Sequence, residues 1–356
     1  MTQNAVKKVR QRLRAKIGTD LQQQEIPMAK RTLKDDRKAL KERELGRYNE
    51  RNYREALRYI EELEMQVNAI EKLKSNRRTH KIRAYKSRGT DEATVVACLS
   101  DVHIGATVRP EQVQGLNQYN MEISRQRVDE FFSKIVKLTK KERQDVHISE
   151  LVLFLGGDII DGALHLDTIM ANDVSEPMMQ AVAAQNWIES GLLHLEPHFE
   201  RITIVCKDGN HSRITQKQRH ATRNGNSLEW AMYQNLAKRH PEFEWVIEDS
   251  YLTYYTVYDE VLRVHHGDAI RYMGGVGGLE VPMKRAYYQW NMTEPATINI
   301  MGHYHSYMPG YNTVNGSLIG YNAYAAQNKF AHQPPIQSYI LLVADKGITQ
   351  HSPILV

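Results

Sequence analysis

Cysteine is almost absent from this chain of 356 residues, which contains only Cys98 and Cys206. Each lies in an apolar run typical of a strand, so we expect two buried free thiols and no disulfide scaffold. Long hydrophobic runs are lacking too, since none reaches the roughly 18 apolar residues that span a bilayer. The N-terminus has basic residues but no apolar core of a secretory signal. These absences predict a cytoplasmic protein without a membrane partner.

Proline and glycine are scarce in residues 1–90, which hold one proline and three glycines and have no strand-like run. Apolar residues between positions 53 and 70 are spaced by three or four, as on one face of a helix. This stripe predicts a short coiled-coil seam or a helix that packs on the rest of the protein, and residues 45–73 are a candidate homo-oligomer surface. Residues 74–91 lack the stripe and are typical of a basic linker.

Acidic residues are few in the same region. Residues 1–90 hold 25 Lys and Arg against 12 Asp and Glu, a net charge of +13, whereas residues 91–356 carry −8, for the total of +5. A basic arm on an acidic body indicates a polyanionic partner for the arm, although a solvated basic helix is the alternative. The predicted division is therefore a helical arm with its linker, residues 1–90, and a catalytic or binding domain, residues 91–356.

From residue 92 the pattern changes to short apolar runs that end in polar residues. The runs are TVVACLSDVH, LVLFLGGD, ITIVCKDGNH, VLRVHHGD and INIMGHYH. Helical stretches at about 121–143 and 175–195 separate the first three runs, which predicts an α/β domain with a mixed sheet. The tail SYILLVADKGITQHSPILV predicts a closing hairpin. In α/β sheets, functional residues gather beyond the carboxyl ends of the strands.

Each of the five runs ends in side chains that bind metals. Residues i and i+2 of a strand share a face, so His303 and His305 point the same way, as do Asp101 and His103. Any one motif occurs by chance in a turn, but five in series indicate a site. The candidate ligands are Asp101, His103, Asp158, Asn210, His266, His303 and His305. Carboxylates, imidazoles and an amide without thiolates suit Mn²⁺, Fe²⁺ or Zn²⁺, and seven ligands suit two ions if one carboxylate bridges them.

The order DxH, GD, GNH, H and GHxH resembles the calcineurin-like metallophosphoesterase superfamily over about residues 93–310. The stretches GDIIDG and GNHSR are most similar to bacteriophage-encoded members and to DNA repair nucleases of this kind. The resemblance implies an α/β four-layer α/β/β/α sandwich with a dinuclear site, for which Mn is preferred over Fe or Zn. If the protein is phage-encoded, its location would be the host cytoplasm.

The resemblance also implies a role for each ligand. One ion would be bound by Asp101, His103 and His305, the other by Asn210, His266 and His303, and Asp158 would bridge them. We choose His266 over its neighbour His265 because the family ligand directly precedes glycine. Strand alternation also directs only one of the two rings to the site.

His211, in the GNH motif, would be the general acid or would stabilise the transition state. The family usually has an acidic residue after GNH, but this chain has Ser212, so Asp161 is the substitute partner that we expect for His211. Arg213 is a candidate phosphate clamp, with a surface arginine as the alternative. We therefore predict His211 and Arg213 as catalytic residues.

The predicted function is hydrolysis of DNA phosphodiesters by a nuclease whose two metal ions hold a hydroxide nucleophile. The basic arm would bind phosphates without sequence preference. Tyr272 and residues 273–280 would form a loop on the substrate side or an ordinary flexible loop, and C-terminal tyrosines would stack on bases or pack in the fold. Basic side chains after the third motif add charge near the site: Lys217, Arg219, His220 and Arg223. The alternatives are a phosphomonoesterase, a small-nucleotide phosphodiesterase, or a DNA-binding scaffold with a vestigial site.

Overall fold

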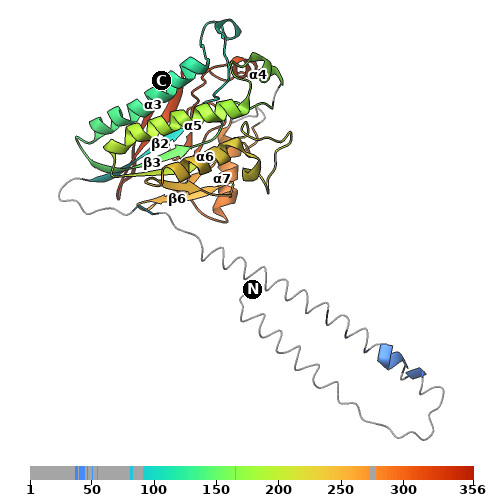
Figure 1. Ribbon diagram of the computed structural model, residues 1–356. Coiled ribbons are helices and arrows are strands. Elements are labelled where there is room, and N and C mark those ends of the chain that lie inside the picture. The colour runs from blue at the N-terminus through green and yellow to red at the C-terminus, as the bar shows by residue number, and fades with distance from the viewer. Residues whose placement is uncertain are drawn as a thin grey trace. The chain divides into compact units, whose positions relative to one another are not determined.

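The protein is described by a computed structural model (Figure 1). It describes residues 91–164, 166–272 and 278–356, and a few positions before residue 91. Those earlier positions are 37–38, 40–44, 46, 50, 54 and 81–82. Of the glycine-rich segment predicted to face the substrate, residues 273–277 lie outside the described residues.

The chain divides into two compact units, Met1–Arg78 and Thr79–Val356. In the first unit, positions 37–38 and 40–44 are helical. The predicted apolar stripe between 53 and 70 and the oligomer surface at 45–73 lie almost wholly outside the described residues, as does the basic linker. The arm and its partner therefore stay predictions.

Six strands of the second unit form one sheet, in the order β11-β10-β2-β3-β4-β5. They are β2 (Glu92–Leu99), β3 (His147–Leu155), β4 (Arg201–Cys206), β5 (Glu244–Ile247), β10 (Ile336–Val343) and β11 (Gly347–Leu355). Strands β2 to β5 are parallel, which brings their carboxyl ends to one edge of the sheet. The predicted hairpin is confirmed as β10 and β11, and β10 pairs antiparallel to β2.

A second sheet has five strands in the order β1-β6-β7-β8-β9. They are β1 (Lys81–Ile82), β6 (Thr253–Val257), β7 (Glu260–Val264), β8 (Ile298–Met301) and β9 (Asn312–Val314). The fourth and fifth predicted runs are β7 and β8, which pair in parallel. The five predicted strand runs are thus divided between two sheets, three in one and two in the other.

Among the described residues, four helices cover the outer faces of the sheets: α3 (Met121–Glu142), α5 (Pro177–Leu195), α6 (Leu228–Arg239) and α7 (Glu280–Asn291). The short helices α4 (Leu166–Ala171) and α8 (Ala323–Gln327) and the 3₁₀ turns η1 (Pro110–Val113), η2 (Glu196–His198) and η3 (Asn224–Asn226) lie in the connections. The two predicted helical stretches are confirmed as α3 and α5, which lie side by side in Figure 1. Asn120 and Ser227 cap α3 and α6, each accepting a hydrogen bond from a first-turn amide.

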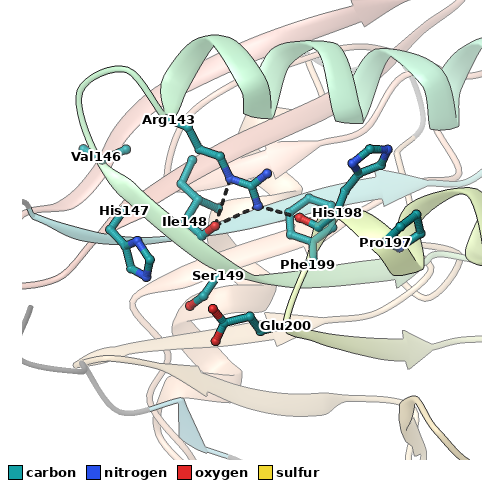
Figure 2. Close-up of a pocket in the computed structure, with 9 residues that line it drawn as sticks. All are labelled: Arg143, Val146, His147, Ile148, Ser149, Pro197, His198, Phe199 and Glu200. Carbon is teal, nitrogen blue, oxygen red and sulfur yellow. Dashed lines mark hydrogen bonds between the residues drawn. The ribbon is translucent and has the colours of Figure 1, made fainter.

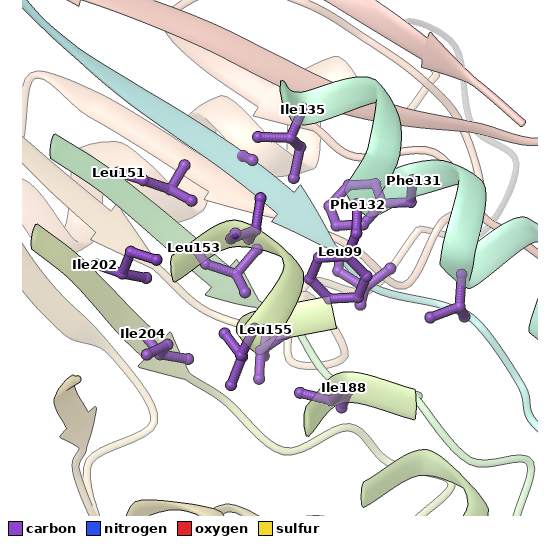
Figure 3. Packing of buried hydrophobic residues seen from close by; sticks show 14 of the residues in the cluster. Leu99, Phe131, Phe132, Ile135, Leu151, Leu153, Leu155, Ile188, Ile202 and Ile204 are labelled. Atoms are coloured by element: carbon purple, nitrogen blue, oxygen red, sulfur yellow. The ribbon is translucent and has the colours of Figure 1, made fainter. Parts of the chain in front are cut away.

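Strand alternation builds two cores on opposite faces of the six-stranded sheet. In β2, Leu99 faces the helices, where Leu153 and Leu155 of β3 pack with Phe132 of α3 and Ile188 of α5 (Figure 3). Residues between them along each strand face the second sheet. Because β2 and β3 are buried on both faces, their sequences are almost continuously apolar.

A core between the two sheets packs the inner layers of the fold against each other. Cys98 of β2 packs there with Val264 and Ile300 of the second sheet, whose other face is covered by Met283 and Tyr287 of α7. The order of layers is therefore helices, six-stranded sheet, five-stranded sheet and helix, which confirms the predicted α/β/β/α sandwich.

Both cysteines are buried and unpaired, as predicted. Cys98 lies in the core between the sheets, whereas Cys206 lies in the core under the helices. No helix among the described residues is long and apolar enough to cross a membrane.

Candidate metal centre

The predicted ligands meet where the carboxyl ends of strands from the two sheets come together. Asp101, Asp158 and Asn210 follow strands of the six-stranded sheet, whereas His266 and His303 follow strands of the other. Several hydrogen bonds join loops of the two sheets at this point, two of them as follows. The His266 Nδ1–H donates to the Gly156 carbonyl oxygen at 2.8 Å, and the His303 amide donates to Asp101 Oδ1 at 2.9 Å.

One group of potential ligands consists of Asp101, His103 and His305, whose donor atoms all lie within 4.8 Å of one another. The Nε2 atoms of His103 and His305 are 3.1 Å apart, and His305 Nε2 lies 3.5 Å from Asp101 Oδ1. Asp101 is fully buried. Donor atoms bound to one metal at about 2.1 Å lie about 3 Å apart at right angles, so this spacing fits a single ion.

A second group consists of Asp158, His266 and His303. His266 Nε2 lies 3.1 Å from both Asp158 Oδ2 and Asn210 Oδ1. Since Nδ1 of this ring already donates to a carbonyl, Nε2 of the neutral ring has a lone pair that faces two oxygen acceptors. Such a convergence of acceptors requires a proton or a cation between them. The donor set therefore fits divalent metal ions.

The same arrangement explains the electrostatics of the second group. Burial disfavours a charged His266, but the Asp158 carboxylate outweighs burial and raises the pKa of His266 to about 10. Burial would likewise raise the pKa of Asp158, yet His266 and His211 hold it well below its usual range. Burial lowers the pKa of His303 to about 4, which keeps this ring neutral, as a metal ligand must be.

Five of the seven predicted ligands have a left-handed backbone. Their φ angles are 54° for Asp101, 54° for His103, 50° for Asp158, 70° for His303 and 50° for His305. This conformation is unfavourable for residues other than glycine, by about 1 kcal/mol or more, and such strain concentrates at functional sites. Their concentration at these strand ends is an independent sign that the site is functional.

Two glycines allow the ligand loops to touch. A Cβ atom on Gly157 would lie 2.4 Å from the Gly209 nitrogen, and a Cβ atom on Gly209 would lie 2.0 Å from Asp158 Oδ1. Neither distance is possible between real atoms, so only glycine fits at these positions. The GD and GNH motifs thus have glycine where the loops are in closest contact.

Asp161 orients two of the histidines. Its Oδ1 accepts from His103 Nδ1 at 3.0 Å, its main-chain oxygen accepts from His211 Nδ1 at 2.9 Å, and its Oδ2 accepts from Asn172 at 2.8 Å. The donor atoms of His103, Asp161 and His211 are close enough for a metal, but these hydrogen bonds already explain their approach. Asp161 thus contacts His211, as we expected, chiefly through its carbonyl group.

His211 lies at the border of the site with its side chain 21% exposed. Its amide donates to Asp158 Oδ1 at 2.8 Å, and its ring is 4.6 Å from that of His103. Burial disfavours the imidazolium ion, but the charges of Asp158 and Asp161 outweigh burial and raise the pKa of His211. A protonated ring at this position is able to donate a proton.

His265 points away from the ligands, as strand alternation predicts. It is fully buried, and its ring centroid lies 5.0 Å from Trp290, 5.7 Å from Tyr251 and 5.9 Å from Tyr287. Burial lowers the pKa of His265 to about 3, so this ring is neutral. The structure brings His266, and not His265, to the other candidate ligands.

Arg213 and the basic residues after it differ in their surroundings. Arg213 donates to the Asn210 carbonyl oxygen and lines a small pocket beside Asn210 with Gln218 and Arg219. Lys217, Arg219 and His220 are exposed. These residues are accessible to an anionic ligand.

Arg223 has two acidic partners instead. Its Nε atom is 3.1 Å from both carboxylate oxygens of Asp208, and its Nη1 atom is 2.8 Å from Asp268 Oδ2. Asp208 precedes the GNH motif and Asp268 follows HHG, so Arg223 ties together the third and fourth ligand loops. Its charge is compensated by these contacts, unlike the free positive charge that we expected.

The C-terminal tyrosines, for which packing in the fold and stacking on bases were the two interpretations, are not equivalent. Tyr304 donates to the Ile270 carbonyl oxygen, and its ring is 5.0 Å from His303, so it packs within the fold. Tyr311 and Tyr324 are 50% and 65% exposed, whereas Tyr307 and Tyr321 are half-buried. A role for any of them in stacking on bases stays a prediction.

Sequence reasoning missed Glu229, in the first turn of α6. Its carboxylate is fully buried and accepts hydrogen bonds from the amides of Ile159, Ile160 and Gly209. The only sequence signal is an acidic residue just after the cap Ser227, which is common at an exposed helix start. Nothing in that pattern predicts that the side chain turns inward.

A second pocket lies far from these residues along the strands, where β3 and β4 begin (Figure 2). The Arg143 guanidinium donates to the carbonyl oxygens of Ile148 and His198 and lies over the Phe199 ring at 5.2 Å. The arginine thus links the end of α3 to these strands. None of the candidate metal ligands lines this pocket.

No protein-family model and no curated protein matches the chain. It is similar to the solved structure of vacuolar protein sorting 29 from Cryptosporidium parvum, with 12% identity, a TM-score of 0.32 and coverage of 75% of this chain and 100% of that chain. A predicted phosphoesterase from Streptococcus pneumoniae has 11% identity, a TM-score of 0.29 and coverage of 73% and 97%. A putative 5′-nucleotidase from Staphylococcus aureus has 10% identity, a TM-score of 0.30 and coverage of 74% and 54%.

Proposed function

We propose that this protein is a dinuclear metal-dependent phosphodiesterase that hydrolyses nucleic acid, with DNA as the substrate. The observation that carries the proposal is the pair of ligand groups built from five strand ends, with His211 beside them. Two ions at such a site can act on both sides of an in-line displacement at phosphorus. A single structural ion would not need seven ligands.

The proposed assignment follows the two groups. Asp101, His103 and His305 would hold one ion, and His266 and His303 would hold the other together with Asn210. Asp158, which belongs to the second group, would be the bridging carboxylate. Imidazole and carboxylate ligands suit Mn²⁺, Fe²⁺ or Zn²⁺, and Mn²⁺ is the ion that we propose. When bound, the ions supply the nucleophile and neutralise the phosphate oxygens.

The remaining chemistry belongs to side chains beside the ligands. Asp161 accepts the Nδ1 proton of His211, and Nε2 is the atom that we assign to protonate the leaving oxygen of the sugar. Arg213, next to Asn210, is positioned to contact a phosphate oxygen. We assign His211 as the general acid and Arg213 as the phosphate clamp.

Nucleic acid is the proposed substrate because of charge. Residues 1–90 carry a net charge of +13, and exposed Lys217, Arg219 and His220 follow the GNH motif. A chain of phosphates is the partner that such charge would bind without sequence preference. Residues 45–73 are a further candidate surface, for self-association.

The test is incubation of the purified protein with labelled single- and double-stranded DNA, with Mn²⁺ or with a chelator. We expect cleavage that requires Mn²⁺. Nitrophenyl phosphate monoester and diester substrates are assayed in parallel. Cleavage of the monoester alone would indicate a phosphomonoesterase, and DNA binding without bound metal or cleavage would indicate a scaffold.

A further inference from the structure

Glu229 has surroundings that are unusual for a carboxylate. It is fully buried in the first turn of α6. Oε1 accepts from the Ile159 amide at 2.6 Å and the Ile160 amide at 3.2 Å, and Oε2 accepts from the Gly209 amide at 2.8 Å. Its two oxygens therefore bind main-chain groups of two separate loops.

Those loops carry candidate metal ligands. Ile159 directly follows Asp158, and Gly209 directly precedes Asn210. The loops touch at this point, since the close approach of Gly209 to Asp158 leaves no space for a Cβ atom. The carboxylate thus bridges the loops one residue away from each ligand.

The start of α6 is hydrogen-bonded to the segment that contains the GNH motif. The Leu228 amide donates to the Ser212 carbonyl oxygen at 3.0 Å, and the Ser227 and Ser212 hydroxyl groups are 2.9 Å apart. Further along the helix, Leu236 is buried in the core under the helices. The first turn of α6, which carries Glu229, is therefore held in place by the GNH segment at its start and by the core further along the helix.

This arrangement disfavours a purely stabilising role. Among the described residues, no cationic side chain forms an ion pair with Glu229, and a buried carboxylate without a counter-charge is unfavourable for folding. Without the carboxylate, the three buried amides would have no hydrogen-bond acceptor, so both loops depend on it. Glu229 is unfavourable for folding but forms hydrogen bonds to two ligand loops. This combination indicates that its role is to set the geometry of the metal site.

We propose that Glu229 is a positioning residue, which holds the Asp158 and Asn210 loops at the separation that allows both side chains to bind metal. The inference rests on the proposed function, because it requires that these residues are ligands. It predicts that the outcome of changing Glu229 is weaker metal binding in a protein that is still folded.

The test is calorimetric titration of the metal-free full-length chain with MnCl₂. In Glu229→Gln an amide NH₂ group replaces one carboxylate oxygen and faces a main-chain N–H, so one loop loses its acceptor. Groups that hold metal ligands in place by hydrogen bonds typically contribute about 10–100-fold to metal affinity, and we expect a loss in that range. With a nitrophenyl phosphodiester, kcat should fall while KM changes little.

The matched control is Leu236→Ala, which removes a buried side chain from the same helix without touching either loop. It should lower the melting temperature but keep the affinity for Mn²⁺. Equal affinity for Mn²⁺ in wild type and Glu229→Gln would overturn the inference, as would an equal loss in the control. If Glu229→Gln does not fold, Glu229→Asp allows the same comparison, because it keeps the charge on a shorter side chain. A wild-type chain that binds no Mn²⁺ would instead overturn the proposed function.

Discussion

Replacing His211 by alanine should separate proton donation from charge stabilisation at the phosphate. The ring does not belong to either ligand group that surrounds Asp158 or Asp101, so both metal ions should remain bound. A sugar alkoxide is a poor leaving group and needs a proton, whereas nitrophenolate leaves without one. The variant should therefore lose much more activity on DNA than on a nitrophenyl phosphodiester.

The expected loss of activity on DNA follows from the protonation of His211 and from the usual contribution of a general acid. At pH 7 an imidazole with the ordinary pKa of 6.5 is about one quarter protonated, and Asp158 and Asp161 raise the pKa of His211, which increases this fraction. A general acid typically contributes about 10²–10⁴-fold, equivalent to about 3–5 kcal/mol of activation free energy. The loss on the nitrophenyl substrate should stay below about tenfold, since that step needs no proton.

The assay measures kcat/KM for both substrates, with the metal content of each preparation. His194→Ala, which removes an exposed imidazole from α5, is the control and should match wild type on both. If His211→Ala reduces both activities by the same factor with two metals bound, His211 is not the general acid. It would then act on charge at the phosphate, which matters equally for either leaving group.

Three further predictions concern metal, charge and pH. Asp158→Asn removes the anion between two cations, so metal analysis should give well below two ions per chain and DNA cleavage should be lost; full occupancy with normal turnover would exclude bridging. A chain that begins at Thr79, where the second unit starts, should still hydrolyse the nitrophenyl diester but bind DNA with a shallower salt dependence. An unchanged slope would indicate that the arm serves self-association, which sedimentation would detect. Burial and the charge of Asp158 raise the pKa of Glu229 from 4.5 to about 7, so the folded metal-free chain binds more protons than the unfolded chain between those values. Its free energy of unfolding should fall as pH rises through this window, by on the order of 2–3 kcal/mol from Glu229 alone; since His211 and His266 titrate in both chains, denaturation at pH 5 and pH 8 should show a loss larger by about this amount in wild type than in Glu229→Gln.

Much of the fold could be read from local patterns. Runs such as LVLFLGGD combine a strand that is buried on both faces with a glycine turn, and each such run became a strand at the expected position. The helices α3 and α5 follow from apolar spacing, and the closing hairpin follows from two apolar strands around ADKG. Strand alternation also distinguished His266 from His265, because neighbouring residues of an extended chain face opposite ways.

Other features depend on contacts between distant segments. The partner of His211 is the main-chain carbonyl of Asp161, which no side-chain pattern can indicate because every residue has one. Arg223 was expected to add free positive charge, but its pairing with Asp208 and Asp268 is formed only when two loops meet. Glu229 resembled an ordinary acidic residue in the first turn of a helix.

The sequence by itself therefore determined the strands, the main helices and the kinds of atom at the strand ends, because these depend on residues close together in the chain. Only the tertiary structure decided that the five strands divide between two sheets whose carboxyl ends meet. Only it decided that ligands up to about 200 positions apart, such as His103 and His305, come within 3.1 Å. Local sequence cannot indicate which distant residues come together, because their proximity results from how the two sheets pack through their shared core.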